Sequence, residues 1–148
     1  MSFESDLYTK LAATTGITSL LGSLSGGAPC IFPVQRPQGS ELPALRYLTI
    51  FDDSQTHLTG TSGITRTSVQ IDCYASTQLE AVNLAEAVRV GLIGARNGRQ
   101  TMGSTFVNCI TLTGKSDEPA TGLQDASDDS VFNRSLDFEI WHAEAIAS

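Results

Sequence analysis

The hydrophobic pattern changes its period once within the stretch "VQIDCYASTQLEAVNLAEAVR", residues 69–89. Up to Ala75, apolar and polar residues alternate, which predicts a strand from about Ile64 to Ala75. After Thr77, apolar residues recur every three or four positions, which predicts an amphipathic helix. Thr77 and Glu80 form a capping box, because each side chain can satisfy the other residue's backbone N–H. The strand is expected to bury Val69, Ile71 and Cys73, and the helix to bury Ala81, Leu84, Ala85, Val88 and Leu92.

Three further segments alternate in the same way and predict three more strands. They are Ala44–Phe51, Thr105–Leu112 and the stretch "FNRSLDFEIWH" at 132–142. Successive side chains of a strand point to opposite faces, so each strand presents one apolar face to the core. In the first of these strands Leu45, Tyr47, Thr49 and Phe51 are predicted to share one face, opposite Arg46, Leu48 and Ile50. The predicted core face of the last strand holds Phe132, Leu136, Phe138 and Ile140. The opposite faces hold Gln70, Asp72 and Tyr74 in the strand at 64–75, and Ser135, Asp137, Glu139 and Trp141 in the last strand.

A second helix is predicted at the N-terminus, where apolar residues recur at the spacing of one helix face. Ser2 can cap it, and Glu4 and Asp6 fall in its first turn, where the helix dipole favours negative charge. Its apolar face comprises Phe3, Leu7, Tyr8 and Leu11. The predicted order is helix, strand, strand, helix, strand, strand. This order indicates an α+β domain with a mostly antiparallel four-stranded sheet and helices packed on one face.

Three connections lack any apolar period. Residues 23–43 are rich in proline, which fixes φ and restricts the preceding residue, so they predict an extended surface arm rather than a core element. Residues 52–63, "DDSQTHLTGTSG", are polar with two glycines and predict a long hairpin loop. Residues 114–130 predict an acidic loop whose length is typical of functional or disordered segments.

Length and composition indicate one globular domain over residues 1–148. The net charge of -7 argues against a protein that binds nucleic acid tightly, because such affinity comes from clustered lysine and arginine. No apolar run is long enough for a membrane span, and the acidic N-terminus does not resemble a signal peptide, so we expect the protein to remain where it is made. The cysteines form no C-x-x-C pair and predict free, buried thiols at Cys30, Cys73 and Cys109.

The strongest enzymatic reading pairs His57 with Asp52 or Asp53 in a small hydrolase, because a carboxylate can orient an imidazole as a general base. The sequence holds no nucleophile motif and no second histidine at a recognised spacing, so a solvated loop histidine is favoured and no enzyme is predicted. The carboxylates in "DASDDS", Asp125, Asp128 and Asp129, suit calcium by their chemistry. They lack the glycine and terminal glutamate of an EF-hand loop, and no metal or cofactor is predicted.

Tyr74 and Trp141 lie on the strand faces that point away from the predicted core. If no helix covers that face, exposed aromatic side chains there suit a subunit interface. A local cross-strand aromatic contact is an equal alternative. The candidate interface or partner residues are Tyr74, Trp141, Asp53, His57, Asp125, Asp128 and Asp129.

The strand and helix of residues 69–89, with "RSLDFEIWH" near the C-terminus, resemble the phage tail completion family of head-tail joining or tail terminator proteins. The arm "IFPVQRPQGSELPALRY" is similar to the family's pattern of Pro, then P-Q-G, then L-P before the first strand. The resemblance covers about residues 7–142. The sequence departs from the family pattern at Ala44-Leu45 and in the length of its acidic loop.

The resemblance implies a structural virion protein that forms a closed ring of about six identical subunits, a hexamer. Such a ring ends growth of the tail tube and joins the tail to the head connector. Implied partners are other copies of the chain, the tail tube protein and the head-tail connector protein. The implied location is the head-proximal end of the tail, after assembly in the host cytoplasm, with the genome passing through an acidic lumen. Alternatives are a tail tube subunit, a head-completion protein, the small hydrolase and a monomeric host-derived binding module.

Overall fold

The computed structural model describes residues 3–23, 27–33, 42–57, 60–94, 97–102, 105–118 and 132–143. At 53–57, 60–63, 118 and 143 only the backbone is described. The helices are α1 (Phe3–Ala13), α2 (Thr15–Thr18) and α3 (Gln78–Ile93). The strands are β1 (Ile31–Pro33), β2 (Ala44–His57), β3 (Gly60–Ala75), β4 (Gln100–Met102), β5 (Thr105–Glu118) and β6 (Phe132–Ala143).

The strands form one six-stranded sheet in the order β1-β2-β3-β6-β5-β4. Its centre is the predicted antiparallel set, in which β2 pairs with β3, β3 with β6 and β6 with β5. The predicted total of four strands is wrong, because β1 adds a parallel strand at one edge and β4 an antiparallel strand at the other. Each of these two strands has three residues, which is too short to show an alternating pattern in the sequence.

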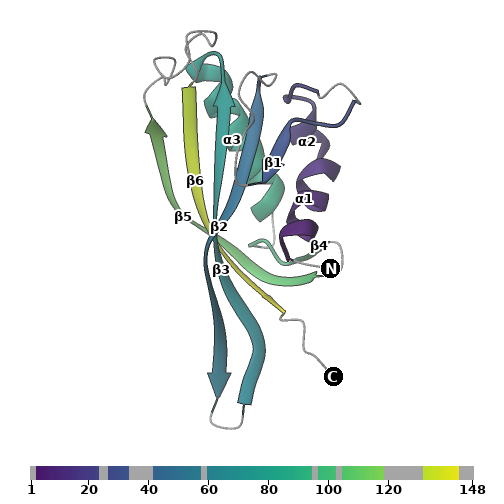
Figure 1. The fold of residues 1–148 in the computed structure, drawn as a ribbon, viewed down its shortest axis with the longest axis vertical. Helices are drawn as coiled ribbons and strands as arrows, with labels where there is room; N and C mark the ends of the chain where they lie inside the picture. Colours follow the sequence, from purple (N-terminus) through teal and green to yellow (C-terminus); the bar gives the residue numbers. More distant parts are fainter. Residues whose placement is uncertain are drawn as a thin grey trace.

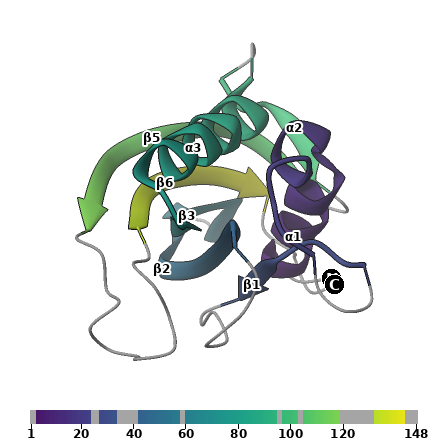
Figure 2. The same cartoon turned by 90° about the horizontal axis from the view of Figure 1, so that it is seen from above.

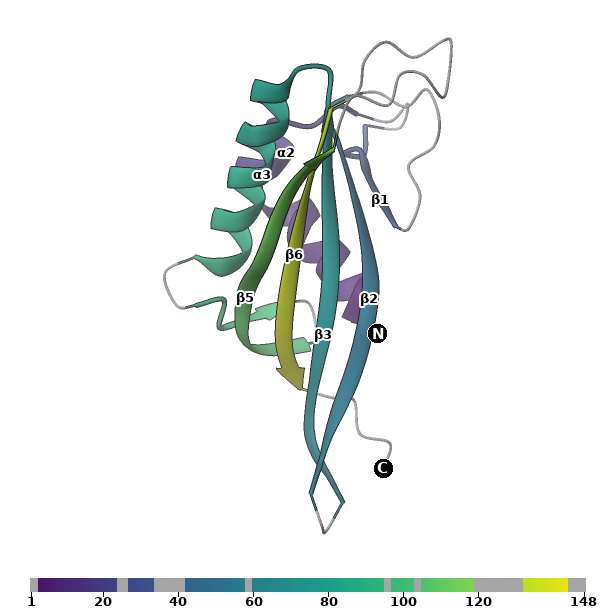
Figure 3. The same cartoon turned by 90° about the vertical axis from the view of Figure 1, so that its left-hand side faces the viewer.

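The sheet curves, and the helices lie against its concave side (Figures 2 and 3). Helix α3 contacts β3, β5 and β6, while α1 contacts the two edge strands β1 and β4. The curvature thus brings both edges of the sheet to one helix. The predicted core faces of α3 and of residues 69–73 are buried, and so are Leu45, Tyr47, Leu136, Phe138 and Ile140.

The prediction that residues 23–43 form a surface arm is wrong where the structure describes them at β1. Cys30 is completely buried, and Ile31 and Phe32 are also buried. The backbone of Ile31 pairs with Leu45 of β2, and Pro33 ends the strand. Proline is tolerated in an edge strand because its missing N–H is not needed for a hydrogen bond to a neighbouring strand there. A proline-rich segment can therefore still place buried side chains in the core.

The hairpin between β2 and β3 is longer than predicted. Residues 52–57 and 60–63, expected in a loop, continue the two strands, and His57 pairs with Gly60. Beyond Ile64 the hairpin has no pairing with β6, and Figures 1 and 3 show it projecting past the rest of the sheet. A ribbon that packs on no helix needs no apolar face, so its sequence lacks the pattern that predicts a strand. Strand β5 likewise extends to Glu118, into the loop predicted at 114–130, whose residues from 119 on lie outside the described chain.

A β-bulge in β2 changes the direction of one aromatic side chain. The register shifts between Thr49, which faces Val69, and Phe51, which faces Ser68. Thr49 therefore points to the helices, while Phe51 points to the convex side of the sheet and is 49% exposed. The prediction that Phe51 shares a face with Leu45 and Tyr47 is wrong, because one extra residue at Ile50 reverses the alternation.

Helix α3 begins and ends at the predicted residues, but only one half of the predicted capping box is formed, because the Glu80 carboxylate accepts from the Thr77 hydroxyl instead of the Thr77 backbone N–H. The backbone N–H of Glu80 donates to the Thr77 hydroxyl at 3.2 Å, and the Thr77 hydroxyl donates to the Glu80 carboxylate at 3.0 Å. Gly94 ends the helix with φ 58°. The turn that follows places Asn97 at φ 54° and Gly98 at φ 84°, and the Ile110 N–H donates to the Asn97 carbonyl at 2.8 Å. The turn leads into β4, and this hydrogen bond attaches it to β5.

All three cysteines are free thiols; Cys30 and Cys73 are buried and Cys109 is half-buried. Burial raises the pKa of the Cys73 thiol well above its ordinary value, so that thiol stays protonated at neutral pH. It behaves as a small apolar side chain of the core.

We predict that Gly98→Ala lowers the free energy of unfolding by about 2–4 kcal/mol, measured by urea denaturation. The new Cβ would lie 2.6–2.7 Å from atoms of Ile110, at a φ of +84° that side chains rarely adopt. Gly16→Ala is the matched control, because a Cβ there meets nothing within 4 Å, and we expect a neutral or slightly stabilising effect. Equal stability of the two variants would contradict this account of the turn.

Candidate interaction surfaces

The convex face of the sheet carries a buried ionic cluster near one end of β2, β3 and β6. The Asp72 side chain is completely buried and accepts hydrogen bonds from the Arg46 guanidinium and the Ser135 hydroxyl. The Gln70 amide also donates to Asp72, at 2.9 Å. Arg46 lies 6.0 Å from the ring centre of Tyr74, which is half-buried. The arginine therefore joins the buried carboxylate to an aromatic ring on the face that carries no helix.

A second cluster lies further along the same face, toward the projecting hairpin. The Arg66 guanidinium lies 5.8 Å from the ring centre of Phe51 and 5.7 Å from that of Trp141, so it lies between two aromatic rings. The Trp141 indole N–H donates to Glu139 at 3.0 Å. Phe51 is 49% exposed, and the neighbouring Ile50 and Ile64 are 56% and 36% exposed. Large apolar side chains gathered at one site of a surface are typical of an interaction site.

Hydrogen bonds attach α1 to the concave side. Thr49 of β2 donates to Glu4 at 3.1 Å, and Thr105 of β5 donates to the buried Asp6. Phe3 stacks on the buried ring of His142, with the ring centres 4.2 Å apart. The first turn of α1 thus uses its two carboxylates to join β2 to β5, which lie on opposite sides of the sheet centre.

His142 belongs to a short polar chain that is structural. The Thr67 hydroxyl donates to Asp52 at 2.6 Å and lies 2.7 Å from Nε2 of His142. Because Thr67 donates its one hydroxyl proton to Asp52, we infer that Nε2 of His142 carries the proton that Thr67 accepts. Thr67 is completely buried, and its hydroxyl is not available as a nucleophile. The chain ties β2 to β3 and β6.

The hydrolase pairing of His57 with Asp52 or Asp53 is wrong, because all three residues lie along one extended strand. A strand rises about 3.3 Å per residue, which separates the backbones of Asp52 and His57 by about 16 Å and those of Asp53 and His57 by about 13 Å. An imidazole cannot reach either carboxylate over that distance. Asp52 instead accepts from Thr67.

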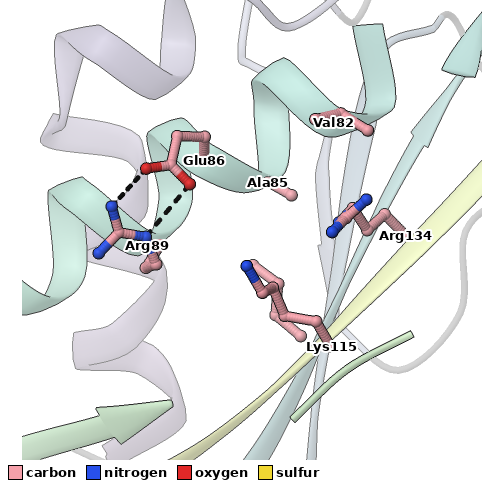
Figure 4. A pocket seen from close by; sticks show the side chains of 7 residues that line it. Val82, Ala85, Glu86, Arg89, Lys115 and Arg134 are labelled. Carbon is pink, nitrogen blue, oxygen red and sulfur yellow. Dashed lines mark hydrogen bonds and ion pairs between the residues drawn. The ribbon is translucent and has the colours of Figure 1, made fainter. Parts of the chain in front are cut away.

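A basic cleft lies between α3 and the strands β5 and β6, with a volume of about 110 Å³ (Figure 4). Its lining residues are Val82, Ala85, Glu86, Arg89, Lys115, Arg134 and Leu136. Figure 4 shows Arg89 turned to Glu86, while the nitrogen ends of Lys115 and Arg134 extend into the space below α3. Nε of Arg89 donates to Glu86 at 3.2 Å, and this contact holds the pKa of the Glu86 carboxyl below its ordinary value. The lining of the cleft therefore holds three cations and the carboxylate of Glu86, and Asp117 of β5 pairs with Arg134 at 3.3 Å.

The predicted interface residues fall into three groups. Tyr74 and Trp141 lie on the convex face as predicted, each beside an arginine rather than in contact with each other. Asp53 and His57 belong to β2, where the structure describes only their backbone atoms. Asp125, Asp128 and Asp129 lie outside the described residues. Among the described residues, no group of three or more His, Cys, Asp or Glu side chains could hold a metal ion.

The arginine and lysine side chains of these surfaces were not among the interface residues predicted from the sequence. Arg46, Arg66 and Arg134 occupy ordinary positions in alternating strands, and Lys115 follows the end of a predicted strand. One signal was available: Arg46 and Arg66 share a strand face with the aromatic residues already identified as exposed. Nothing in the spacing of Arg89, Lys115 and Arg134 indicates that the three meet.

The helices that the structure describes include none with the length and apolar character needed to cross a membrane.

Comparison with known proteins identifies the family of this chain and a protein of similar fold. Residues 5–143 match the family described as "Tail completion protein gp17". No curated protein matches the sequence. The chain is similar in structure to a chain of the "Virion of native gene transfer agent (GTA) particle", with a TM-score of 0.65 and 14% identity. The similarity covers 96% of this chain and 95% of that chain, and at this identity it shows a shared fold.

We predict that Asp72→Ala lowers the free energy of unfolding by about 3 kcal/mol, because it leaves Arg46 and Ser135 without their shared acceptor. Asp137→Ala is the matched control, since Asp137 is an exposed carboxylate on the same face of β6, and we expect a change within about 0.5 kcal/mol. Urea denaturation of both variants provides the measurement. A stability of Asp72→Ala equal to that of the control would show that the cluster contributes nothing to folding.

Proposed function

Because the chain belongs to the family of tail completion protein gp17, and is thus a structural protein of phage tail assembly, we propose that it forms a closed ring at the head-proximal end of the tail. The ring ends the growth of the tail tube and offers the head connector a docking surface. Its partners are other copies of itself, the tail tube protein and the head-tail connector protein. It assembles in the host cytoplasm and remains in the virion.

The observation that carries this proposal is the one-sided covering of the sheet. Helices α1 and α3 cover the concave side, whereas the convex side exposes Phe51, Ile50 and Ile64 beside a hairpin that projects from the body. This surface differs from the rest of the subunit, so a contact between it and another part of a second copy is heterologous. Heterologous contacts produce closed rings where the rotation between neighbours closes.

The charge of the chain suits a ring through which the genome passes. A net charge of -7 does not favour tight binding of a phosphate backbone. An acidic lumen repels DNA and leaves it free to slide.

The alternative function within the virion is a tail tube subunit or a head-completion protein, and oligomer geometry separates these from a terminator. We expect purified protein to form closed rings of uniform size in negative-stain images. Filaments that lengthen with protein concentration would identify a tube subunit, and a monomer at all concentrations would overturn the proposal.

Deletion of the gene from a phage that carries it tests the role in assembly. We expect separate heads and tails, with tails of irregular length, because tube growth lacks its terminator. Restoration by a plasmid copy of the gene is the control. Normal virions from the deletion strain would refute the proposed role.

We also predict that Phe51→Ser disrupts the ring, because it removes an exposed aromatic side chain from the convex face. Leu20→Ser is the matched control: Leu20 is 40% exposed, comparable to Phe51 at 49%, but lies next to α2 on the helical side. Analytical ultracentrifugation should show at least a tenfold weaker association for Phe51→Ser and no change for Leu20→Ser. Unchanged association of Phe51→Ser would remove the convex face from the interface.

A further inference from the structure

We propose that the basic cleft between α3, β5 and β6 binds carboxylates of a neighbouring copy of the chain, supplied by its acidic stretch at residues 118–129. This inference rests on the proposed ring and identifies one of its contacts. It concerns the helical side of the subunit, so it is independent of the aromatic surface on the convex face.

The cleft concentrates positive charge in a chain that has little of it. Three of the nine lysine and arginine residues, Arg89, Lys115 and Arg134, line one cleft. They come from a helix and two strands, so the fold brings them together although 45 residues separate the first from the last. Glu86 neutralises Arg89, and Asp117 lies 3.3 Å from Arg134. Lys115 makes no ion pair with any described residue.

The size and floor of the cleft favour a side-chain carboxylate over a nucleotide. A volume of about 110 Å³ is well below the several hundred Å³ typical of small-molecule sites. The apolar lining residues Val82, Ala85 and Leu136 can contact aliphatic carbon atoms, while Lys115 and Arg134, whose nitrogen ends extend into the space below α3, can pair with a negative charge. Glu86 at the rim, together with the net charge of the chain, opposes a polyanion such as DNA.

The chain itself carries a complementary sequence. Residues 118–129 contain four carboxylates, Glu118, Asp125, Asp128 and Asp129, and no lysine or arginine occurs between Lys115 and Arg134. Among the described residues, the lining of the cleft comes from α3, β5 and β6. A basic cleft and an acidic stretch on the same polypeptide form a heterologous pair between copies, which is the type of contact that a ring repeats.

A charge exchange between two variants tests this contact. Lys115→Glu reverses the charge of the cleft, and Asp125→Lys/Asp128→Lys/Asp129→Lys reverses that of the acidic stretch. Each variant alone should associate at least tenfold more weakly than the wild type in analytical ultracentrifugation at 0.15 M salt. An equimolar mixture of the two should recover rings, because a ring that alternates the variants pairs opposite charges at every interface.

Arg99→Glu is the matched control, since it makes the same charge change at an exposed arginine outside the cleft, and we expect wild-type association. Circular dichroism should show the wild-type fold for both single-site variants. Rings of Lys115→Glu as stable as the wild type would overturn the cleft contact and leave the proposed ring intact. Recovery only when both changes are in one chain, and not in the mixture, would assign the acidic stretch to its own cleft and overturn the contact between copies. A wild-type protein that forms no ring would overturn both proposals.

Discussion

The packing of helices on only one side of the sheet is the constraint on which the rest of this structure depends. The apolar side chains of β2, β3, β5 and β6 that face α3 and α1 form the main core, and Cys30, Phe32 and Ala44 form a smaller buried cluster beside β1. Because the sheet curves around α1, its short edge strands β1 and β4 both reach that helix. Burial of one face supplies the hydrophobic stabilisation of the fold, and it leaves the composition of the other face free to serve contacts.

On the convex face, arginine side chains lie beside aromatic rings. Arg46 lies near Tyr74, and Arg66 lies between Phe51 and Trp141. Arginine suits this position because its planar guanidinium stacks on rings while it pairs with a carboxylate. The buried Asp72 holds Arg46 in place, so the side chains near it are ordered before any partner arrives. Ordered side chains lose less conformational entropy on association.

The two proposed contacts of the subunit lie on opposite sides of the sheet. Exposed apolar groups on the convex face contribute through burial, which salt does not screen, whereas the basic cleft contributes charge pairing, which salt does screen. In a ring that combines the two contacts, apolar burial on the convex face supplies affinity. Charge pairing in the basic cleft fixes the orientation of neighbouring copies, because charge complementarity selects one arrangement. Family membership explains why such a subunit is built for assembly, and the identity of each contact comes from the surfaces themselves.

The sequence by itself determined the central antiparallel strands, α3 with its Thr77 cap, the core faces of β3 and β6, and the outward direction of Tyr74 and Trp141. These features depend on period and on contacts within a few residues, which a linear pattern records. Only the tertiary structure decided that Phe51 faces outward, that β1 and β4 extend the sheet, and that residues 52–63 continue a hairpin. A bulge of one residue reverses a face without changing composition, and a three-residue strand exists only because a neighbour pairs with it. The meeting of Arg89, Lys115 and Arg134 likewise depends on how a helix crosses two strands, which no local spacing encodes.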